Sequence, residues 1–217
     1  MGANRAAPWP AVFLDRDGVI NQNVWNAVSG EYEAPLTAAE FVLLPGALEA
    51  LRRLQRAGFL LFVVSNQPNY AKGKATLEEL AAIDAKMRRR VAAAGVRFAG
   101  VYYCLHHPEG IVQEYSGACV CRKPSPYFLL RAMREFSVDA AQSWMVGDRE
   151  TDVICGRAAG VRTIFIDERG VGHGGKEADW IAPDLSGAAE HICRELYGKQ
   201  KFNLNDAGRV PILQPPA

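Results

Sequence analysis

The stretch AVFLDRDG at residues 11–18 runs from four apolar residues directly into two carboxylates and a glycine. An apolar run of this length is typical of a strand buried on both faces of a sheet. Asp15 and Asp17 follow it, so one carboxylate could act as a nucleophile and the other as a proton donor or acceptor. Gly18 would let the backbone turn sharply behind them. Taken alone, the motif fits a plain turn after a strand equally well.

Short apolar runs of the same kind alternate with helical patterns along the chain. The runs lie at residues 60–64, 100–104, 144–146 and 163–166. The helical patterns cover residues 47–57, 76–94, 126–136, 151–159 and 185–196. This alternation is typical of a doubly wound, Rossmann-like α/β fold, in which a parallel sheet carries helices on both faces. In such sheets ligands bind beyond the carboxyl ends of the strands.

Some segments carry signals for where elements begin and end. Thr76 and Glu79 have the spacing of a capping box, and Gly95 would end the helix that they start. We predict residues 23–44 as a long polar connection after the first strand, of a length that is often functional.

Length and composition place the chain among ordinary globular proteins. It has 217 residues, 49% of them hydrophobic and 23% charged, which argues against disorder and coiled coil. We predict one domain at residues 1–197 and a surface tail at residues 198–217, where the helical period is lost and prolines gather.

Charge and hydropathy limit the partners. A net charge of +1 argues against a dedicated nucleic-acid binder. The longest apolar run, residues 59–64, is far shorter than the about 20 residues of a membrane-spanning helix. Residues 1–10 lack the apolar core of a signal peptide. We therefore expect a cytoplasmic, monomeric protein with no membrane or nucleic-acid partner.

Polar residues also follow the other predicted strands. Ser65 comes after the second strand and could hold a phosphoryl oxygen, although a serine that caps the strand is the simpler interpretation. Asp148 and Asp152 follow the fourth strand, where carboxylates could bind a hard cation such as Mg²⁺. Lys123 precedes a predicted helix and would bring a positive charge to the same edge. Considered without the other motifs, the Arg122-Lys123 pair would be an ordinary solvated feature of the surface.

The chain has five cysteines, and Cys104, Cys119 and Cys121 lie within 18 residues, beside two histidines. In a reducing compartment such crowding favours metal binding over disulfides. Three sulfurs and one imidazole form a closed tetrahedral set suited to structural zinc. We choose His106 as the fourth ligand because its Cys-x-His step mirrors the later Cys-x-Cys step. A chance group of buried thiols beside a surface histidine is the alternative.

The zinc loop would lead directly into Arg122 and Lys123, so the metal would position these two residues without performing chemistry. The remaining cysteines, Cys155 and Cys193, lie in helical patterns and are predicted to be ordinary buried thiols. His173 lies in a glycine-rich stretch and is predicted to be a loop residue.

The order and spacing of these motifs are more specific than any one of them. Asp-x-Asp-Gly, then Ser, then Lys, then Gly-Asp-x-x-x-Asp resemble the four motifs of the haloacid dehalogenase (HAD) superfamily of phosphotransferases, over residues 12–166. The resemblance implies that Asp15 is the nucleophile and Asp17 the general acid and base. It also implies that Ser65 and Lys123 hold and neutralise the transferring phosphoryl group.

The same resemblance implies a Mg²⁺ site. Its ligands would be the Asp15 carboxylate, the Asp17 backbone carbonyl and Asp148. Asp152 would orient metal-bound water or Lys123.

The pattern Cys-x-His-His-Pro followed by Cys-x-Cys-Arg-Lys-Pro resembles one branch of that superfamily. This branch contains the D-glycero-D-manno-heptose-1,7-bisphosphate 7-phosphatases and the histidinol-phosphate phosphatases, which have no large cap domain. The resemblance implies a Mg²⁺-dependent phosphatase with structural zinc, acting on a phosphorylated sugar. A heptose bisphosphate is the first expectation, and histidinol phosphate or another small phosphate ester is the alternative. The implied substrate contacts are Asn23, Val24, Trp25, Asn26, Asn66, Gln67, Pro68, Arg122 and Arg149.

A zinc-containing binding module is the alternative from a different class. The chain lacks Cys-x-x-Cys knuckles, and no basic face surrounds the cysteines, which argues against it.

Two stretches depart from the pattern of the branch. After Gln67 the chain reads Pro68-Asn69-Tyr70, which removes a backbone donor near the phosphate and adds bulk. The loop at residues 23–37 is longer than is usual in the branch, and its Trp25 and Tyr32 could cover the cleft, stack on substrate or pack on their own loop.

Overall fold

The computed structural model describes residues 8–27, 29–168 and 174–199. The helices and strands of this part of the chain are, in order, β1 (Ala11–Leu14), β2 (Val24–Asn26), β3 (Glu31–Glu33), α1 (Ala47–Arg56), β4 (Leu60–Asn66), α2 (Leu77–Ala93), β5 (Gly100–Cys104), η1 (Gln113–Tyr115), α3 (Tyr127–Phe136), η2 (Ala140–Gln142), β6 (Trp144–Gly147), α4 (Glu150–Ala159), β7 (Arg162–Ile166), β8 (Trp180–Ala182) and α5 (Leu185–Lys199).

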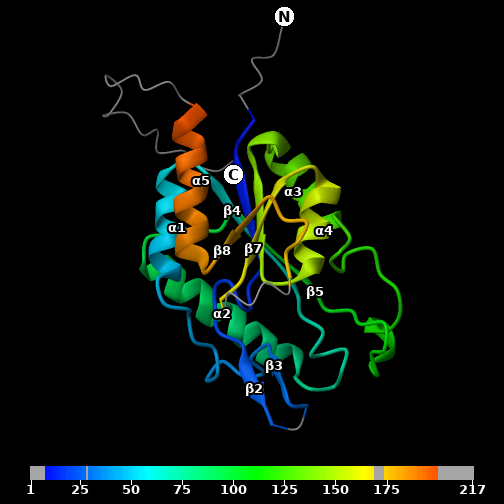
Figure 1. Ribbon diagram of the computed structural model, residues 1–217. Coiled ribbons are helices and arrows are strands. Elements are labelled where there is room, and N and C mark those ends of the chain that lie inside the picture. The colour runs from blue at the N-terminus through cyan, green and yellow to red at the C-terminus, as the bar shows by residue number, and fades with distance from the viewer. Residues whose placement is uncertain (1–7, 28, 169–173, 200–217) are drawn as a thin grey trace, which may run out of the picture.

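The central sheet has six strands in the order β5-β4-β1-β6-β7-β8, and every neighbouring pair is parallel. The doubly wound class predicted from the sequence is therefore confirmed (Figure 1). The chain leaves β1 for β4 on one side and later returns to β6 on the other side. In sheets of this kind ligands bind at such a reversal, here beyond the carboxyl ends of β1, β4 and β6.

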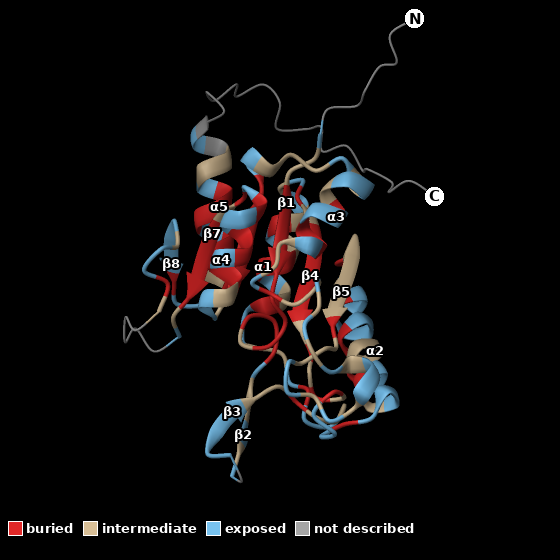
Figure 2. Cartoon of the chain, turned by 90° about the vertical axis from the view of Figure 1, so that its right-hand side faces the viewer, coloured by how far each residue is buried: buried red, intermediate tan, exposed pale blue. Residues whose placement is uncertain are grey.

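Helices cover both faces of the sheet because the side chains of each strand alternate. Val12 and Leu14 of β1 pack into the core formed with α1, α2 and α5. Ala11 and Phe13 pack into the second core, formed with α3 and α4. All four side chains are fully buried, and the interior strands form a buried slab (Figure 2). The uninterrupted apolar run of β1 is thus explained by two cores, one on each face.

Helix ends follow the local sequence signals. The capping box of α2 forms as predicted, with Thr76 Oγ1 accepting from Glu79 N–H and Glu79 Oε2 accepting from Thr76 N–H. At the other end of the chain, α5 continues to Lys199, past the predicted end of the domain. The rest of the predicted tail, residues 200–217, and His173 lie outside the described residues.

The prediction of residues 23–44 as a connection without regular structure was wrong in part. β2 and β3 pair there as an antiparallel hairpin, in which Trp25 lies opposite Tyr32. Their rings meet edge to face with centroids 5.2 Å apart, yet both side chains stay more than half exposed. A hairpin of three-residue strands has too short an alternation to be recognised by period.

The edge strand β8 was also missed. It is three residues long, and its Trp180 and Ile181 are largely exposed, so it lacks the apolar run of the inner strands. Within the described ranges, no helix is long and apolar enough to cross a membrane. Between Ser65 and Lys123 the described chain contains α2, β5 and η1, with no folded cap domain.

Two adjacent leucines of α3 provide a test of the second core. Leu129 is fully buried, whereas Leu130 is 39% exposed. We expect Leu129→Ala to lower the free energy of unfolding by about 2–5 kcal/mol, because it leaves a cavity. Leu130→Ala should cost less than about 1 kcal/mol. Chemical denaturation of both variants measures the difference, and equal losses would contradict the assigned packing.

Candidate active site

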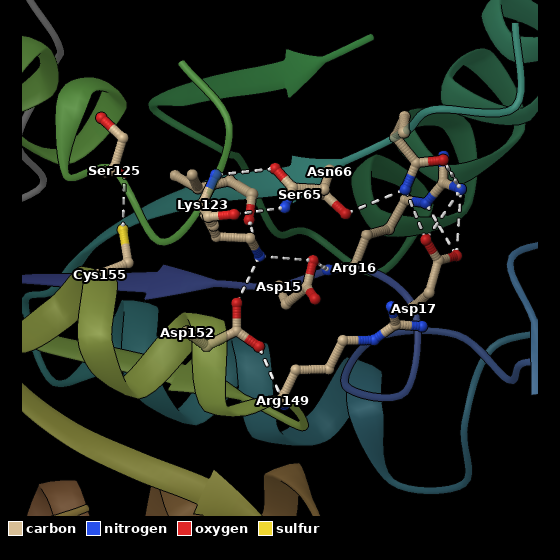
Figure 3. A network of polar contacts seen from close by, with 12 residues as sticks. Asp15, Arg16, Asp17, Ser65, Asn66, Lys123, Ser125, Arg149, Asp152 and Cys155 are labelled. Atoms are coloured by element: carbon tan, nitrogen blue, oxygen red, sulfur yellow. Dashed lines mark hydrogen bonds and ion pairs between the residues drawn. The ribbon is translucent and has the colours of Figure 1, made fainter. Parts of the chain in front are cut away.

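The ammonium of Lys123 joins three of the predicted strand-end motifs. Its Nζ lies 3.0 Å from Asp15 Oδ1 and 2.6 Å from Asp152 Oδ1, and it donates to the carbonyl oxygen of Val64 at 2.7 Å. Asp15 follows β1, Asp152 lies in the first turn of α4, and Val64 belongs to β4. Figure 3 shows the lysine between the two carboxylates. The residues predicted to carry the chemistry therefore meet at one edge of the sheet.

Lys123 is held in its charged form. The residue is 3% exposed, and such burial alone would lower its pKa. The neighbouring charges of Asp15 and Asp152 outweigh burial, so the pKa of Lys123 is raised above its ordinary value. A permanent positive charge stands at the point where a phosphoryl group would need neutralisation.

Asn66 fixes the backbone that carries this lysine. Its Oδ1 accepts from Lys123 N–H at 3.0 Å, and its Nδ2 donates to the Lys123 carbonyl at 3.1 Å. The sequence pattern predicts Asn66 as a substrate contact. In the structure its amide pairs with the chain, so β4 and the loop before α3 are joined directly beside the site.

Three carboxylates form a group that fits a divalent cation. Asp15, Asp148 and Asp152 each offer an oxygen, and these oxygens lie within 4.8 Å of one another. Asp148 Oδ1 is buried without a hydrogen-bond partner. Burial, followed by the negative charges of Asp15 and Asp152, raises the pKa of Asp148 to about 8. Crowded carboxylates with a free buried oxygen are the ligand chemistry that Mg²⁺ prefers.

Two glycines make room for these carboxylates. Gly18 has a φ of +77°, and a Cβ there would lie 2.2 Å from Asp148 Oδ2. A Cβ on Gly147 would lie 2.2 Å from the Asp152 carboxylate. Glycine is therefore required in the Asp-x-Asp-Gly and Gly-Asp motifs, because a Cβ at either position would clash with a carboxylate of the site.

The Asp17 side chain sits in a dense set of donors, part of which the sequence analysis missed. Its Oδ1 accepts from Arg16 Nη2 at 3.0 Å and from Asn21 Nδ2 at 2.9 Å. Its Oδ2 accepts from Gln67 Nε2 at 2.5 Å. Arg16, Asn21 and Gln67 are each at most 1% exposed. Arg16 could have been predicted from the sequence, because it is a charged residue between two carboxylates. No local pattern indicates the role of Asn21.

The four predicted zinc ligands come together at the end of β5. Cys119 Sγ lies 3.6 Å from both Cys104 Sγ and Cys121 Sγ. His106 Nδ1 lies 3.7 Å from Cys121 Sγ and 4.0 Å from Cys104 Sγ. Tetrahedral zinc with bonds of about 2.3 Å to sulfur and 2.0 Å to nitrogen requires separations of about 3.8 Å between two sulfurs and about 3.5 Å between nitrogen and sulfur, within about 0.5 Å of those observed. The observed spacing therefore fits a bound zinc ion.

His107 has a different structural role from His106. Its backbone N–H donates to the Tyr115 carbonyl at 3.0 Å, and its Nδ1 accepts from Glu109 N–H at 3.1 Å. It closes the loop around the cluster and is not among the residues whose ligand atoms converge.

The Pro68-Asn69-Tyr70 stretch, which departs from the pattern of the branch, packs against the loop that carries the cysteine cluster. The Tyr70 ring packs edge to face on Tyr115 at 5.1 Å, and Tyr115 contacts the His106 ring at 5.4 Å. The backbone N–H of Ile111 also donates to the Ala71 carbonyl at 2.7 Å. The turn after β4 is therefore supported by the loop that carries the ligands.

The other predicted substrate contacts lie in several places. Val24, Trp25 and Asn26 line a hollow of about 210 Å³ on the hairpin, together with Glu33 and Glu40. Glu33 binds Lys74 at 2.7 Å, which lowers the pKa of Glu33 to about 2 and ties the hairpin to the turn after β4.

Four more predicted contacts lie on the loops that follow β1, β4, β5 and β6. Asn23 lies near Gly18, with its Oδ1 buried and unpartnered. Arg122 is half-buried and donates from Nη1 to the His106 carbonyl at 3.2 Å. Arg149 is exposed at the start of α4, and its N–H donates to Asp152 Oδ2 at 3.1 Å. Pro68 is half-buried and begins the turn after β4.

The two remaining cysteines are buried, as predicted. Cys193 belongs to α5 and packs into the first core. Cys155 is fully buried, donates to the Ser125 carbonyl at 3.2 Å, and has its pKa raised to about 12 by burial.

The comparisons with known proteins agree with this geometry. A family model described as HAD-hydrolase-like matches residues 120–190. The fold and the strand-end residues together define the class: the chain is a HAD-like phosphatase, a phosphoric monoester hydrolase.

Sequence relatives define the family within that class. A D-glycero-beta-D-manno-heptose-1,7-bisphosphate 7-phosphatase of Yersinia pestis is 37% identical over 82% of this chain and 92% of its own length. A phosphatase of the same name from Vibrio cholerae is 41% identical over 74% of this chain and 82% of its own length. The chain belongs to this family of heptose-bisphosphate phosphatases.

A solved structure shows the same fold with ligands. The D,D-heptose 1,7-bisphosphate phosphatase of B. bronchiseptica, complexed with magnesium and phosphate, superposes with a TM-score of 0.73 at 29% identity. The match covers 86% of this chain and 99% of that one.

Gly147 gives a direct test of the carboxylate geometry. In Gly147→Ala the new methyl would displace Asp152 and break its ion pair with Lys123. We expect kcat/KM for an aryl phosphate to fall by about 100-fold or more, as for a group misplaced by about 1 Å. Gly198→Ala, which meets no atom within 4 Å, serves as the matched control and should retain activity. Equal activity of both variants would contradict the assigned contact.

Proposed function

We propose that this chain hydrolyses the 7-phosphate of D-glycero-D-manno-heptose 1,7-bisphosphate through an aspartyl-phosphate on Asp15. The observation that carries the proposal is the buried Lys123 bound to Asp15 and Asp152 beside a serine hydroxyl and a free Asp148 oxygen. The substrate is the one after which the family relatives are named.

The first half-reaction transfers the phosphoryl group to the protein. An Asp15 carboxylate oxygen bonds to phosphorus while the bond from phosphorus to the sugar oxygen breaks. Lys123 and the Ser65 hydroxyl bind the phosphoryl oxygens and neutralise their charge. The leaving sugar oxygen takes a proton from the Asp17 carboxyl group, because an alkoxide is otherwise a poor leaving group.

The second half-reaction restores the enzyme. The Asp17 carboxylate takes a proton from a water molecule, whose oxygen bonds to phosphorus as the bond to Asp15 breaks. Inorganic phosphate leaves, and Asp17 carries the proton that the next cycle needs.

The Asp15 and Asp148 carboxylates and the Asp17 backbone carbonyl would hold Mg²⁺, with Asp152 orienting Lys123. When bound, the ion would supply positive charge that binds the phosphoryl group and offsets the repulsion among the carboxylates.

The substrate side of the site combines cations with a sugar-sized hollow. Arg122 and Arg149 are the cations assigned to the second phosphate, since a guanidinium binds phosphate in bidentate fashion. The hollow lined by Val24, Trp25 and Asn26 offers the Glu33 and Glu40 carboxylates, which can accept from sugar hydroxyls.

The Cys104, His106, Cys119 and Cys121 cluster is assigned as structural zinc. The set is closed, because four protein ligands fill the tetrahedron and leave no position for substrate. Zinc would hold the loop from which Arg122 and Lys123 project, and through Tyr115 it would support the turn after β4.

A substrate panel tests the function. Phosphate release is measured from both anomers of the heptose bisphosphate, fructose bisphosphate and histidinol phosphate, with Mg²⁺ and again with EDTA. We expect a heptose bisphosphate to have the highest kcat/KM by at least about 10-fold, and EDTA to abolish turnover. Asp15→Asn should abolish release from every ester. Equal kcat/KM values across the panel would overturn the substrate, and an active Asp15→Asn would overturn the phosphoaspartate.

Elemental analysis tests the zinc site. We expect about one zinc per chain, retained in Cys193→Ser and lost when Cys119 and Cys121 are both changed to Ser. The double variant should also unfold at a lower temperature, because metal binding contributes to folding. Equal zinc content in the two proteins would contradict the assignment.

A further inference from the structure

The side chain of Gln67 connects the phosphoryl-binding serine to the acid–base carboxylate. Its Nε2 donates to Asp17 Oδ2 and, at 2.9 Å, to Ser65 Oγ, and its Oε1 accepts from Arg16 Nη2 at 2.7 Å. We propose that Gln67 is a positioning residue that fixes the orientation of the Asp17 carboxyl group. This inference rests on the acid–base role given to Asp17 in the proposed function.

The burial of Gln67 argues for a role through its neighbours. The residue is 1% exposed, so its amide lies beneath the site and not on its open surface. A buried amide without partners would destabilise the fold, yet here both ends are used by groups of the site. The family resemblance implies a substrate contact for Gln67; in the structure its side chain bonds to Asp17, Ser65 and Arg16.

The chemistry of the partners fixes which way the amide faces. Only the NH₂ end can donate to the Asp17 carboxylate and the Ser65 hydroxyl oxygen. Only the carbonyl end can accept from the Arg16 guanidinium, which has no acceptor of its own. A flipped amide would place two acceptors together and two donors together, so a single orientation is stable.

Arg16 provides a rigid backing for this arrangement. Its guanidinium is 1% exposed and binds Asp17 Oδ1 through both Nε and Nη2. It also lies over the Tyr103 ring at 5.6 Å, and the Tyr103 hydroxyl donates to Asp84 on α2 at 2.9 Å. The Gln67 amide is therefore held from behind by a buried charge that β5 and α2 keep in place.

The consequence concerns the direction of proton transfer. Asp17 can protonate the sugar oxygen only if its carboxyl group faces that oxygen while Ser65 and Lys123 hold the phosphoryl group. Gln67 touches Asp17 and Ser65 at once, so one amide sets the acid relative to the bound phosphoryl group. Because Ser65 Oγ accepts from Gln67, its own proton is free for a phosphoryl oxygen.

Loss of this amide should have a signature that depends on the leaving group. An alkyl ester needs the Asp17 proton as its oxygen leaves, whereas p-nitrophenolate leaves without one. The ratio kcat/KM covers the steps up to release of the alcohol, so it reports the acid step and excludes later hydrolysis of the aspartyl-phosphate.

The experiment compares Gln67→Met with the parent on the heptose bisphosphate and on p-nitrophenyl phosphate. Methionine keeps the length of the side chain and removes the hydrogen bonds. We expect kcat/KM to fall by about 10-fold or more for the sugar ester and by at most about twofold for the aryl ester. Equal losses on both esters, or no loss on either, would overturn the proposal.

Two further proteins serve as controls for folding. Gln55→Met removes a glutamine that also makes two hydrogen bonds, to Gly95 O and Arg97 N, but lies on α1. It should keep parental kcat/KM on both esters. Gln67→Asn keeps the amide and shortens its reach, and it should show the same selectivity as Gln67→Met. It replaces Gln67→Met in the comparison if the methionine variant does not fold.

A double-mutant cycle separates this inference from the function on which it rests. Asp17→Asn should show a larger selective loss on the sugar ester, and adding Gln67→Met should then change little, because the residue that Gln67 positions is gone. Full additivity of the two losses would overturn the positioning role. An Asp17→Asn variant without selective loss would instead overturn the acid–base assignment itself.

Discussion

The rest of the site depends on one buried ion pair network, the contact of the Lys123 ammonium with Asp15 and Asp152. The lysine and both acids are almost fully buried, so each charge has lost its water and relies on the others. Breaking such a network by removing one partner costs about 3–5 kcal/mol, because the remaining charge stays buried. The same cost holds Asp15, Lys123 and Asp152 in one arrangement, the residues proposed here as the nucleophile, the phosphate-binding cation and the acid that orients this cation.

The surrounding structure serves to place this lysine. The Asn66 amide forms hydrogen bonds with the Lys123 backbone, and the Val64 carbonyl accepts a hydrogen bond from the Lys123 ammonium. The loop before Lys123 carries Cys119 and Cys121 of the Cys104 cluster. Gly147 removes the side chain that would keep Asp152 away. These contacts come from β4, β5 and β6, strands that are neighbours of β1 or one strand away. The sheet order is thus what turns scattered motifs into a site.

A second buried charge supports the other half of the chemistry. Arg16 and Gln67 hold Asp17 in a set of hydrogen bonds beside the lysine network. Each carboxylate of the Asp-x-Asp motif therefore has its own buried cation: Lys123 for Asp15 and Arg16 for Asp17. These separate partners support the separate tasks proposed for the two acids, Asp15 as nucleophile and Asp17 as proton carrier.

The inner strands, the helices and the candidate site residues could be predicted from the sequence alone, because their signals are local. The strands of the two cores are continuous apolar runs, the start of α2 is marked by Thr76 and Glu79, and Asp-x-Asp-Gly and the cysteine spacing are local patterns. The β2–β3 hairpin and β8 escaped detection because three-residue strands with exposed side chains have no clear period.

The contacts of the residues next to the motifs could not be predicted from the sequence and became visible in the folded chain. Asn66 and Gln67 follow the motif serine and look alike in sequence, yet one pairs with the Lys123 backbone and the other with Asp17. Their partners lie 57 and 50 residues away. Local sequence reports propensity and period, whereas the partner of a buried amide is set by which strands become neighbours in the sheet.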